Sequence, residues 1–299
     1  MISNTDSRCG YVAVIGKPNT GKSTIMNRLL GINLSVVNRK VQTTRNKILG
    51  ILSKDNYQVI FLDTPGILEP KYELQKFMIT EITSSLKEAD IVLHTMDATT
   101  IDKKKLAETE NKYEKLFKGK KRINVINKMD LVSKEKILNI IGDLKTTLNY
   151  ENIVPVSALK AINIEELEKV IVENLPESSF FYDRETVTDK PENFFVSEII
   201  RQKILDMFHE EIPYSVFVHI RKFTEREYSK DYINAEIILE RESQKIILIG
   251  RKGEKLKKLG SLARKSIEEF LGREVYLELF VKVRKDWRKD KKFIKDNLF

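Results

Sequence analysis

The chain has 299 residues, of which 41% are hydrophobic and 32% are charged, a composition that excludes a wholly disordered protein. Its net charge of +9 indicates an acidic partner. The longest apolar runs, such as Ile91–Leu93 and Ile246–Ile249, are far shorter than the roughly 20 residues that a membrane-spanning helix needs.

The length predicts two domains, because a compact domain usually takes roughly 100 to 200 residues. Residues 1–8 are polar and lack the apolar stretch of a secretory signal, so we expect a cytosolic protein. The single cysteine, Cys9, cannot form an internal disulfide, and no neighbouring residues complete a zinc site. We therefore expect Cys9 to be inert.

Short apolar runs alternate with helical patterns through the first half of the chain. This alternation predicts an α/β domain in which a mostly parallel sheet has helices on both faces. Lys47–Leu52 and Tyr57–Leu62 read as an antiparallel hairpin, so the six-stranded sheet is expected to be mixed. Asn163 followed by Glu166 predicts a capping box that opens the last helix. The other expected strands are Tyr11–Ile15, Ile91–Met96, Ile123–Ile126 and Ile153–Val156.

The last helical pattern of this half ends before Pro176, which predicts a first domain of residues 1–178. Residues 179–191 mix serine, acids and aromatics without a period, as is typical of a linker. Residues 192–299 form the second expected domain, which is α+β. Its expected elements are helices over Phe194–Phe208 and Glu254–Leu271 and strands over Ser215–Ile220, Ala235–Leu239 and Val275–Val283.

Residues 16–23 match the pattern G-x-x-x-x-G-K-[ST], directly after an expected strand and directly before a helical pattern. The glycines let the backbone wrap a phosphate, so that N–H groups and the helix N-terminus point at its oxygens. We expect Lys22 to neutralise the β- and γ-phosphates and Ser23 to give its hydroxyl to Mg²⁺. The expected nucleotide contacts here are Gly16, Lys17, Pro18, Asn19, Thr20, Gly21, Lys22, Ser23 and Thr24.

Two further motifs follow strands of the same expected sheet. Asp63-Thr64-Pro65-Gly66 places an aspartate where it can hold Mg²⁺ and a glycine N–H where it can meet the γ-phosphate. Asn127-Lys128-Met129-Asp130 selects the base, because the Asp130 carboxylate can accept two hydrogen bonds from guanine, and adenine lacks these donors. The expected nucleotide is therefore GTP, with GDP as the product, and the domain is a P-loop GTPase domain.

At this point the chain resembles the translation-factor-related GTPases, which carry these three motifs in this order. Their fourth motif appears as Ser157-Ala158-Leu159, and the resemblance implies that this segment contacts the guanine oxygen through its backbone. It also implies that a threonine of the loop Gln42–Arg45 joins Mg²⁺ in the GTP state. We favour Thr44, which directly precedes the arginine, and Thr43 stays an alternative. The expected metal ligands are Ser23, Thr44 and Asp63, and the expected catalytic residues are Lys22, Thr44 and Gly66.

The residue after Gly66 is Ile67, whereas the Ras branch of GTPases has there a glutamine that orients the attacking water. Intrinsic hydrolysis is therefore expected to be slow. Asn19 matches the asparagine that potassium-stimulated relatives use to hold a monovalent cation against the phosphates, so the resemblance also implies a K⁺ site near Asn19.

A second binding surface is expected in Ile246–Gly253, where an apolar run expected as a strand leads into a Gly-x-x-Gly turn and a helix. This is the layout of a KH domain. Its glycines let the backbone approach a nucleic-acid strand, basic residues meet phosphates and an apolar groove holds unstacked bases. Trp287 is expected either to stack on a base or to pack in the core. The expected RNA contacts are Ile249, Gly250, Arg251, Lys252, Gly253 and Lys257.

A GTPase domain followed by a KH-type domain makes the chain similar to the Era family along nearly its whole length. The resemblance is carried by both glycine turns and by Gln42–Arg45, Asp63–Gly66, Asn127–Asp130, Ile212–Ser215 and Val281–Arg284 before Trp287-Arg288. It implies binding of small-subunit ribosomal RNA near its 3′ end, a role in small-subunit assembly, and peripheral association of a cytoplasmic protein with the inner face of the cell membrane. We expect a monomer.

Three functional hypotheses follow. In the first, the chain is a GTP-hydrolysing switch whose γ-phosphate orders Thr44 and the loop after Asp63, and this ordering changes how the KH domain faces RNA. In the second, the chain is chiefly an RNA-binding assembly factor, and GTP is a slowly cleaved structural ligand. In the third, the chain is a membrane-surface GTPase whose basic end binds anionic lipid; the Gly-x-x-Gly turn argues against this reading.

Overall fold

The computed structural model describes residues 7–35, 44–209 and 212–298. Contacts within the chain divide it into two compact units, residues 1–70 with 75–189 and residues 71–74 with 190–299. Each unit contains its own hydrophobic core. The domain bounds expected from the sequence, 1–178 and 192–299 with a linker at 179–191, stay a prediction.

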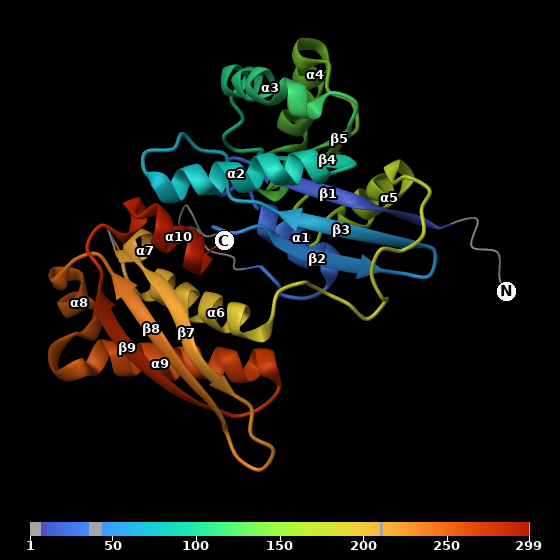
Figure 1. Cartoon of the computed structure of the whole chain (residues 1–299). Helices are drawn as coiled ribbons and strands as arrows, with labels where there is room; N and C mark the ends of the chain where they lie inside the picture. The colour runs from blue at the N-terminus through green and yellow to red at the C-terminus, as the bar shows by residue number, and fades with distance from the viewer. Residues whose placement is uncertain (1–6, 36–43, 210–211, 299) are drawn as a thin grey trace. The chain divides into compact units, whose positions relative to one another are not determined.

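The first unit contains a six-stranded sheet (Figure 1). Its strand order is β2-β3-β1-β4-β5-β6, and all neighbouring pairs are parallel except the antiparallel hairpin β2–β3. The mixed, mostly parallel sheet expected from the alternation of apolar runs is therefore confirmed. The strands are β1 (Arg8–Gly16), β2 (Ile48–Ser53), β3 (Tyr57–Asp63), β4 (Ile91–Asp97), β5 (Lys121–Asn127) and β6 (Ile153–Pro155).

Helices cover both faces of this sheet, which explains why its central strands are apolar at consecutive positions rather than at alternate ones. Val12, Ala13, Val14 and Ile15 of β1 are all fully buried. Ala13 and Ile15 pack towards α2 and α3, whereas α1 and α5 lie together on the other face (Figure 1). The helices of this unit are α1 (Lys22–Leu30), α2 (Glu73–Glu88), α3 (Lys103–Phe117), α4 (Lys134–Leu148) and α5 (Ile164–Asn174).

Helix α5 begins after Asn163, but the expected capping box with Glu166 is wrong. Asn163 has a φ of 58°, in the left-handed region, and makes no side-chain cap, whereas a capping residue normally has an extended backbone. Its Nδ2 instead donates a hydrogen bond to the carbonyl oxygen of Pro155 at 2.9 Å. The side chain therefore ties the start of α5 to the end of β6.

Residues of the expected linker pack on the hairpin β2–β3. The rings of Phe180 and Tyr182 lie against a core cluster that includes Ile51. The backbone N–H of Ile51 donates to the carbonyl oxygen of Val187 at 2.8 Å, and Gln58 Nε2 donates to the carbonyl oxygen of Tyr182 at 2.9 Å. The segment thus covers part of the free edge of β2, an edge that would otherwise expose unpaired backbone groups.

The second unit is α+β, as expected, with the three-stranded sheet β7-β8-β9. β7 and β8 are antiparallel and β8 and β9 are parallel. Helices α6 and α9 pack on one face of this sheet, where Ile200, Ile237 and Ala263 belong to one core cluster (Figure 1). The elements are α6 (Glu192–Met207), α7 (Ile212–Ser215), β7 (Phe217–Thr224), β8 (Asp231–Leu239), α8 (Glu242–Ile249), α9 (Glu254–Leu271), β9 (Val275–Val283) and α10 (Lys291–Leu298).

The apolar run Ile246–Ile249 lies in helix α8, so the strand expected there is wrong. A run of four apolar residues has no period that separates a strand from a helix. Here the Gln244 side chain accepts hydrogen bonds from the backbone N–H groups of Glu240 at 3.0 Å and Arg241 at 3.1 Å, which stabilises the start of α8. The Gly-x-x-Gly turn therefore joins two helices.

Candidate functional site

The phosphate-binding motif forms the turn between β1 and α1. Gly16 has a φ of 151° and Gly21 a φ of 95°, values that side chains disfavour. A Cβ on Gly16 would lie 2.3 Å from the carbonyl oxygen of Thr95, and one on Gly21 would lie 2.1 Å from Asn127 Nδ2. Both positions therefore require glycine. The turn ends at the N-terminus of α1, where free N–H groups and the helix dipole suit a phosphate.

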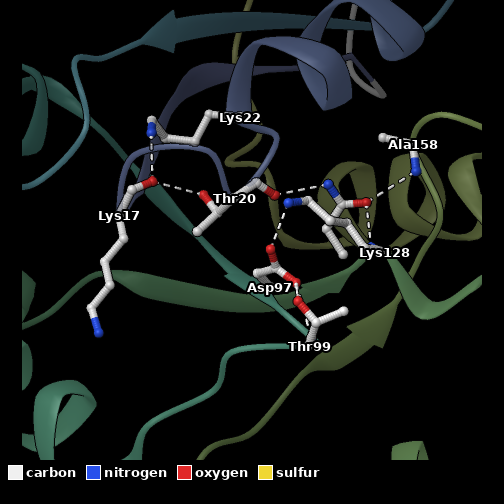
Figure 2. Close-up of polar contacts among 8 residues, drawn as sticks. Lys17, Thr20, Lys22, Asp97, Thr99, Lys128 and Ala158 are labelled. Atoms are coloured by element: carbon white, nitrogen blue, oxygen red, sulfur yellow. Dashed lines mark hydrogen bonds and ion pairs between the residues drawn. The ribbon is translucent and has the colours of Figure 1, made fainter. Parts of the chain in front are cut away.

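Lys22 and Asp63 place buried opposite charges beside this turn. Lys22 Nζ donates to the carbonyl oxygens of Lys17 at 3.1 Å and Gly16 at 3.3 Å, and the first of these bonds is drawn in Figure 2. Burial lowers the pKa of Lys22 to about 8, although Asp63 opposes the shift. Burial also disfavours the charged form of Asp63 and so raises its pKa. Phosphates beside Lys22 and a cation beside Asp63 favour the charged forms of both groups.

Three oxygen groups converge where α1 begins. Ser23 Oγ donates to Asp63 Oδ2 at 2.8 Å and lies 3.1 Å from Thr44 Oγ1. The other carboxylate oxygen, Asp63 Oδ1, is buried and makes no hydrogen bond of normal geometry to the residues that the structure describes. A buried carboxylate next to two hydroxyls offers the oxygen ligands that a hard cation such as Mg²⁺ prefers. The structure thus brings Thr44 to the expected metal site, whereas Thr43 lies outside the described residues.

The loop after β3 runs against the phosphate-binding turn. The backbone N–H of Ile67 donates to the carbonyl oxygen of Gly16 at 3.0 Å. A Cβ on Gly66 would lie only 2.7 Å from Pro18 Cγ and 2.8 Å from Pro18 N. Gly66 therefore allows the close approach of the two loops, and this places its backbone beside the residues expected to hold the phosphates.

Asn127 is the central residue of the base-binding motif, and its partners Thr20, Lys128 and Ala158 are labelled in Figure 2. Its Nδ2 donates to the carbonyl oxygen of Thr20 at 2.8 Å, and its Oδ1 accepts from the backbone N–H groups of Lys128 at 2.8 Å and Ala158 at 3.0 Å. One buried amide thus joins the phosphate-binding turn, the segment after β5 and the Ser157–Leu159 segment. Losing this side chain would disconnect three parts of the site at once.

Asp130 is the expected contact to guanine. The hydroxyl of Ser157 lowers the pKa of Asp130, with a further contribution from Lys160, whose Nζ lies 3.7 Å from Asp130 Oδ2. An ionised carboxylate only accepts hydrogen bonds, which is what the two N–H donors of guanine require. Leu159, the last residue of the Ser157–Leu159 segment, is 74% exposed.

Two contacts at this site were missed by sequence reasoning. Lys128 Nζ forms an ion pair with Asp97 Oδ2 at 2.5 Å, and the register of β4 and β5 pairs Asp97 with Asn127. Arg28 Nε donates to the carbonyl oxygen of Ala158 at 2.9 Å, holding the Ser157–Leu159 segment to α1. The position of Asp97 at the end of an expected strand was the only sequence signal for the first contact. The sequence held no signal for the contact of Arg28.

The Gly-x-x-Gly turn lies between α8 and α9. Gly250 has a φ of 73°, Lys252 of 49° and Gly253 of 79°, left-handed values that bend the backbone sharply. A Cβ on Gly250 would lie 2.7 Å from Lys255 Cγ. Of the other expected RNA contacts, Arg251, Lys252 and Lys257 are exposed and Ile249 is half-buried. The structure thus presents a basic loop at the N-terminus of α9, an arrangement that suits a phosphate backbone.

A groove of about 720 Å³ continues from this turn between α9 and β9. Apolar side chains from both elements line it, and basic residues lie among them. It has the size and lining that the KH interpretation expects for unstacked bases. Its lining includes Gly253, Leu256, Lys257, Arg264, Leu277 and Leu279.

Trp287 packs in the core of the second unit. Its side chain is fully buried, and its Nε1 donates to the carbonyl oxygen of Ser215 at 2.8 Å. The centroids of the Phe217 and Phe293 rings each lie 5.9 Å from that of Trp287. A ring covered on all sides offers no face to a base, so stacking on RNA, the other reading of Trp287, is wrong.

Comparisons with known proteins give matches to both units. The family model for 50S ribosome-binding GTPases matches residues 11–128, and the KH domain model matches residues 211–288. A crystal structure of a variant of Aquifex aeolicus Era bound to GDP·AlF₄⁻ is 40% identical, covers 96% of this chain and 98% of that one, and has a TM-score of 0.90. A crystal structure of Era in complex with MgGDPNP and nucleotides 1506–1542 of 16S ribosomal RNA is also 40% identical, with 97% and 98% covered and a TM-score of 0.90.

Proposed function

The chain belongs to the Era family of GTPases, and we infer from this that it is a GTP-hydrolysing switch that binds the 3′ region of small-subunit ribosomal RNA and acts in small-subunit assembly. The observation that carries this function is the meeting of Ser23, Thr44 and Asp63 at one end of the phosphate-binding turn. In the related structures, GDPNP stands in for GTP, and AlF₄⁻ beside GDP stands in for the phosphoryl group in transfer.

The proposed roles in GTP binding follow from these contacts. The backbone of the phosphate-binding turn and Lys22 hold the β- and γ-phosphates, and Lys22 exchanges its two carbonyl partners for phosphate oxygens. Ser23, Thr44 and Asp63 hold Mg²⁺, which neutralises charge on the β- and γ-phosphates when it is bound. Asp130 accepts the guanine donors, and Asn127 keeps the base-binding and phosphate-binding parts in register.

The proposed hydrolysis step uses the loop after β3. Gly66 gives its backbone N–H to the γ-phosphate, and no side chain at position 67 can orient the attacking water, because Ile67 is apolar and packs partly into the core beside α2 and α3. Slow intrinsic turnover follows. The γ-phosphate, by ordering Thr44 and this loop, also sets the RNA affinity of the second unit.

We also propose a K⁺ site at Asn19. Asn19 is exposed on the phosphate-binding turn with a φ of 63°, so a cation held by its side-chain oxygen would lie near the expected phosphates. A monovalent cation there would add positive charge where the leaving phosphate becomes negative. Phosphate release should therefore be faster in KCl than in NaCl, and Asn19→Ala should remove the difference. Equal rates in both salts would refute the site.

A second candidate function is that of an RNA-binding assembly factor for which GTP is chiefly a structural ligand. The apolar, half-buried Ile67 favours it, since it leaves hydrolysis without a residue that orients water. Under this function RNA binds well in the GTP state and leaves turnover unchanged.

Peripheral membrane association of a cytoplasmic protein also remains a proposal. Among the residues that the structure describes, no helix combines the length and apolar character that a membrane crossing needs. The basic side chains of the second unit would attract an anionic lipid surface, and 150 mM salt should weaken this attraction. Flotation with vesicles that contain anionic lipid tests it, and recovery of the protein with neutral vesicles alone would contradict it.

The principal experiment measures GTP turnover at fixed Mg²⁺ with and without RNA that corresponds to nucleotides 1506–1542 of 16S ribosomal RNA. It compares the wild type with Gly253→Asp, which adds a negative charge to the turn at a backbone conformation that aspartate tolerates. Gly272→Asp is the matched control, because Gly272 also has a positive φ, of 69°, with open space around it, but ends α9 away from the turn.

The switch function predicts that RNA changes turnover in the wild type and in Gly272→Asp but has no effect on Gly253→Asp. Tight RNA binding by the wild type, with turnover that RNA leaves unchanged in all three proteins, would favour the assembly-factor function. Absence of RNA binding in the wild type would refute both.

A further inference from the structure

Ser35 is a buried serine that lies outside the motifs of the nucleotide site. It is 4% exposed, and its Oγ makes no hydrogen bond of normal geometry within the described part of the chain. A buried hydroxyl without a partner lowers stability, because it loses its contacts with water and gains no other bond. The fold alone therefore does not explain the hydroxyl, and alanine at position 35 would remove its cost.

Asn27 of α1 holds the backbone of Ser35 at two points. Asn27 Nδ2 donates to the carbonyl oxygen of Ser35 at 2.8 Å, and the backbone N–H of Ser35 donates to Asn27 Oδ1 at 2.9 Å. Asn27 is 8% exposed, so water competes little for these bonds. Because the two bonds hold one residue, they fix its orientation, and we call them the Asn27–Ser35 clamp.

Helix α1 places this clamp beside the expected metal site. Asn27 and Ser23 are four residues apart in α1, so their side chains lie on one face of the helix. Ser23 Oγ donates to Asp63 Oδ2 at 2.8 Å. Burial raises the pKa of Asp63, and Lys22 opposes this rise most strongly. The hydroxyls of Ser23 and Ser35 oppose it as well, so Ser35 lies close to the carboxylate that Ser23 contacts.

Ser35 Oγ and Asp63 Oδ1 are suited to each other as partners. Both atoms are buried, and neither makes a hydrogen bond of normal geometry to any residue that the structure describes. A hydroxyl can donate and an ionised carboxylate accepts. Hydrogen bonds of a binding site are often poorly aligned without the ligand and shorten when it binds. A cation beside Asp63 would favour the ionised carboxylate and hence this bond.

We propose that Ser35 is a positioning residue of the metal site, and this inference rests on the Mg²⁺-dependent nucleotide binding proposed above. Its hydroxyl donates to Asp63 Oδ1 when the cation is held, which fixes the carboxylate while Oδ2 stays with Ser23. Asn27 acts one step further from the metal, because it holds Ser35. Helix α1 thus supplies Ser23 directly and orients Asp63 through the Asn27–Ser35 clamp.

The test measures how Mg²⁺ slows the release of a fluorescent N-methylanthraniloyl derivative of GDP. GDP is used because the expected role of Thr44 belongs to the GTP state. Release from the wild type should slow as Mg²⁺ is added. Ser35→Ala should need about 10-fold more Mg²⁺ for half of this effect, since residues that orient metal ligands contribute that much to metal affinity. In excess EDTA the two proteins should release the nucleotide at the same rate.

Stability gives a second readout. Unfolding without Mg²⁺ and nucleotide, followed by circular dichroism, should be unchanged in Ser35→Ala or should occur at a slightly higher temperature, because an unpaired buried hydroxyl is removed. Trp287 is the only tryptophan of the chain and lies buried in the second unit, so its fluorescence follows the unfolding of that unit separately.

Ser85→Ala is the matched control. Ser85 is fully buried in α2, and its Oγ donates to the carbonyl oxygen of Glu81 at 2.8 Å. The substitution removes a buried hydroxyl from a helix that carries no expected metal ligand. It should leave the Mg²⁺ dependence of release unchanged.

Asn27→Ala tests the clamp. It should shift the Mg²⁺ dependence at least as far as Ser35→Ala does. The double variant should shift it no further than Asn27→Ala alone, because the two side chains act through the same contact. Additive shifts, or a wild-type Mg²⁺ dependence in folded Asn27→Ala, would refute the role of the clamp.

Each outcome for Ser35→Ala decides the proposal. A shifted Mg²⁺ dependence with equal release in EDTA and undiminished stability supports the positioning role. A wild-type Mg²⁺ dependence refutes that role alone. Lower stability, or release that is faster by the same factor at every Mg²⁺ concentration and in EDTA, also refutes it, because the hydroxyl would then serve the fold. Release from the wild type that does not depend on Mg²⁺ refutes the proposed metal site and this inference with it.

Discussion

Both binding surfaces of this chain are glycine turns that lead into a helix, but the charged groups around them are placed in opposite ways. At the nucleotide site, Lys22 is 6% exposed and Asp63 is fully buried, and both are held by hydrogen bonds, Lys22 to two carbonyl oxygens and Asp63 from the Ser23 hydroxyl. At the RNA surface, Arg251, Lys252 and Lys257 are exposed to solvent. The charged groups of the nucleotide site are therefore fixed by burial in the structure, whereas those of the RNA surface are open to solvent.

The difference determines how each surface should respond to change. Removing one buried charge leaves its neighbours without compensation in a poorly solvated place, so single substitutions have large effects. Removing one exposed charge costs little by itself, but the attraction of exposed charges to a polyanion is weakened by salt. Variants at the two surfaces therefore test this difference.

The largest effect is expected for Lys22→Ala. Without the ammonium group, charge that develops on the β- and γ-phosphates loses its fixed partner, and hydrolysis should slow by about 1000-fold. Phosphate release at saturating GTP and Mg²⁺ measures this. Lys105→Ala is the control, because Lys105 is an exposed lysine of α3, with 63% of its side chain accessible. A loss below tenfold in Lys22→Ala would contradict the proposed role.

Asp130→Asn should weaken GTP binding by about 100-fold, since two hydrogen bonds to a charged acceptor are lost. The amide can instead donate to an oxygen, so the variant should bind xanthosine triphosphate better than GTP. Competition between the two nucleotides for the purified variant measures the preference. If the variant kept its preference for GTP, Asp130 would not be the base-reading group.

The sequence predicts the nucleotide site well because its motifs are sets of adjacent residues with fixed backbone demands. Gly16 and Gly21 are glycines for steric reasons that any related loop shares. The mixed, mostly parallel sheet around them also follows from the alternation of apolar runs and from the expected hairpin. By contrast, the contacts Asp97–Lys128 and Arg28–Ala158 join residues far apart in the chain, and only strand register and helix packing bring them together.

The errors have the same origin in the competition between local signals and tertiary contacts. Ile246–Ile249 has strand-like composition, but the run lies in α8, whose start is stabilised by the Gln244 side chain. Asn163 has the right spacing for a cap, but its side chain donates a hydrogen bond to the carbonyl oxygen of Pro155 instead. Trp287 sits among basic residues in the sequence, and its burial becomes evident only from its contacts in space.

Burial of His94 should make the free energy of unfolding of the first unit depend on pH. Burial lowers the pKa of His94 from 6.5 to about 4, while Glu110 opposes the shift and Arg122, Lys17 and Lys22 add to it. The unfolded chain therefore binds more protons than the folded chain between pH 6.5 and 4. Lowering the pH from 7 to 5 should reduce the free energy of unfolding by about 2 kcal/mol through this group.

His94→Phe keeps a ring beside Tyr150, which contacts His94 edge-on, but does not titrate. Guanidinium unfolding followed by circular dichroism at pH 7 and pH 5 should show a smaller loss in the variant than in the wild type. The transition seen by Trp287 fluorescence, which follows the second unit, should shift equally in both proteins. An identical pH dependence of the first unit in both proteins would contradict the role of His94.

The smallest effect is expected at the RNA surface, for the double substitution Arg251→Gln with Lys252→Gln. If both side chains contact phosphates, RNA affinity should fall by about 10-fold at 100 mM salt, and the slope of log affinity against log salt should become shallower by about 1.4, or 0.7 per contact. GTP affinity should stay the same. The control, Lys104→Gln with Lys105→Gln on α3, removes the same net charge elsewhere. If the control weakened RNA binding equally, the attraction would come from net charge alone. A loss of RNA affinity in the Arg251 and Lys252 variant alone would instead show that the position of these charges in the turn, and not only their number, determines RNA binding.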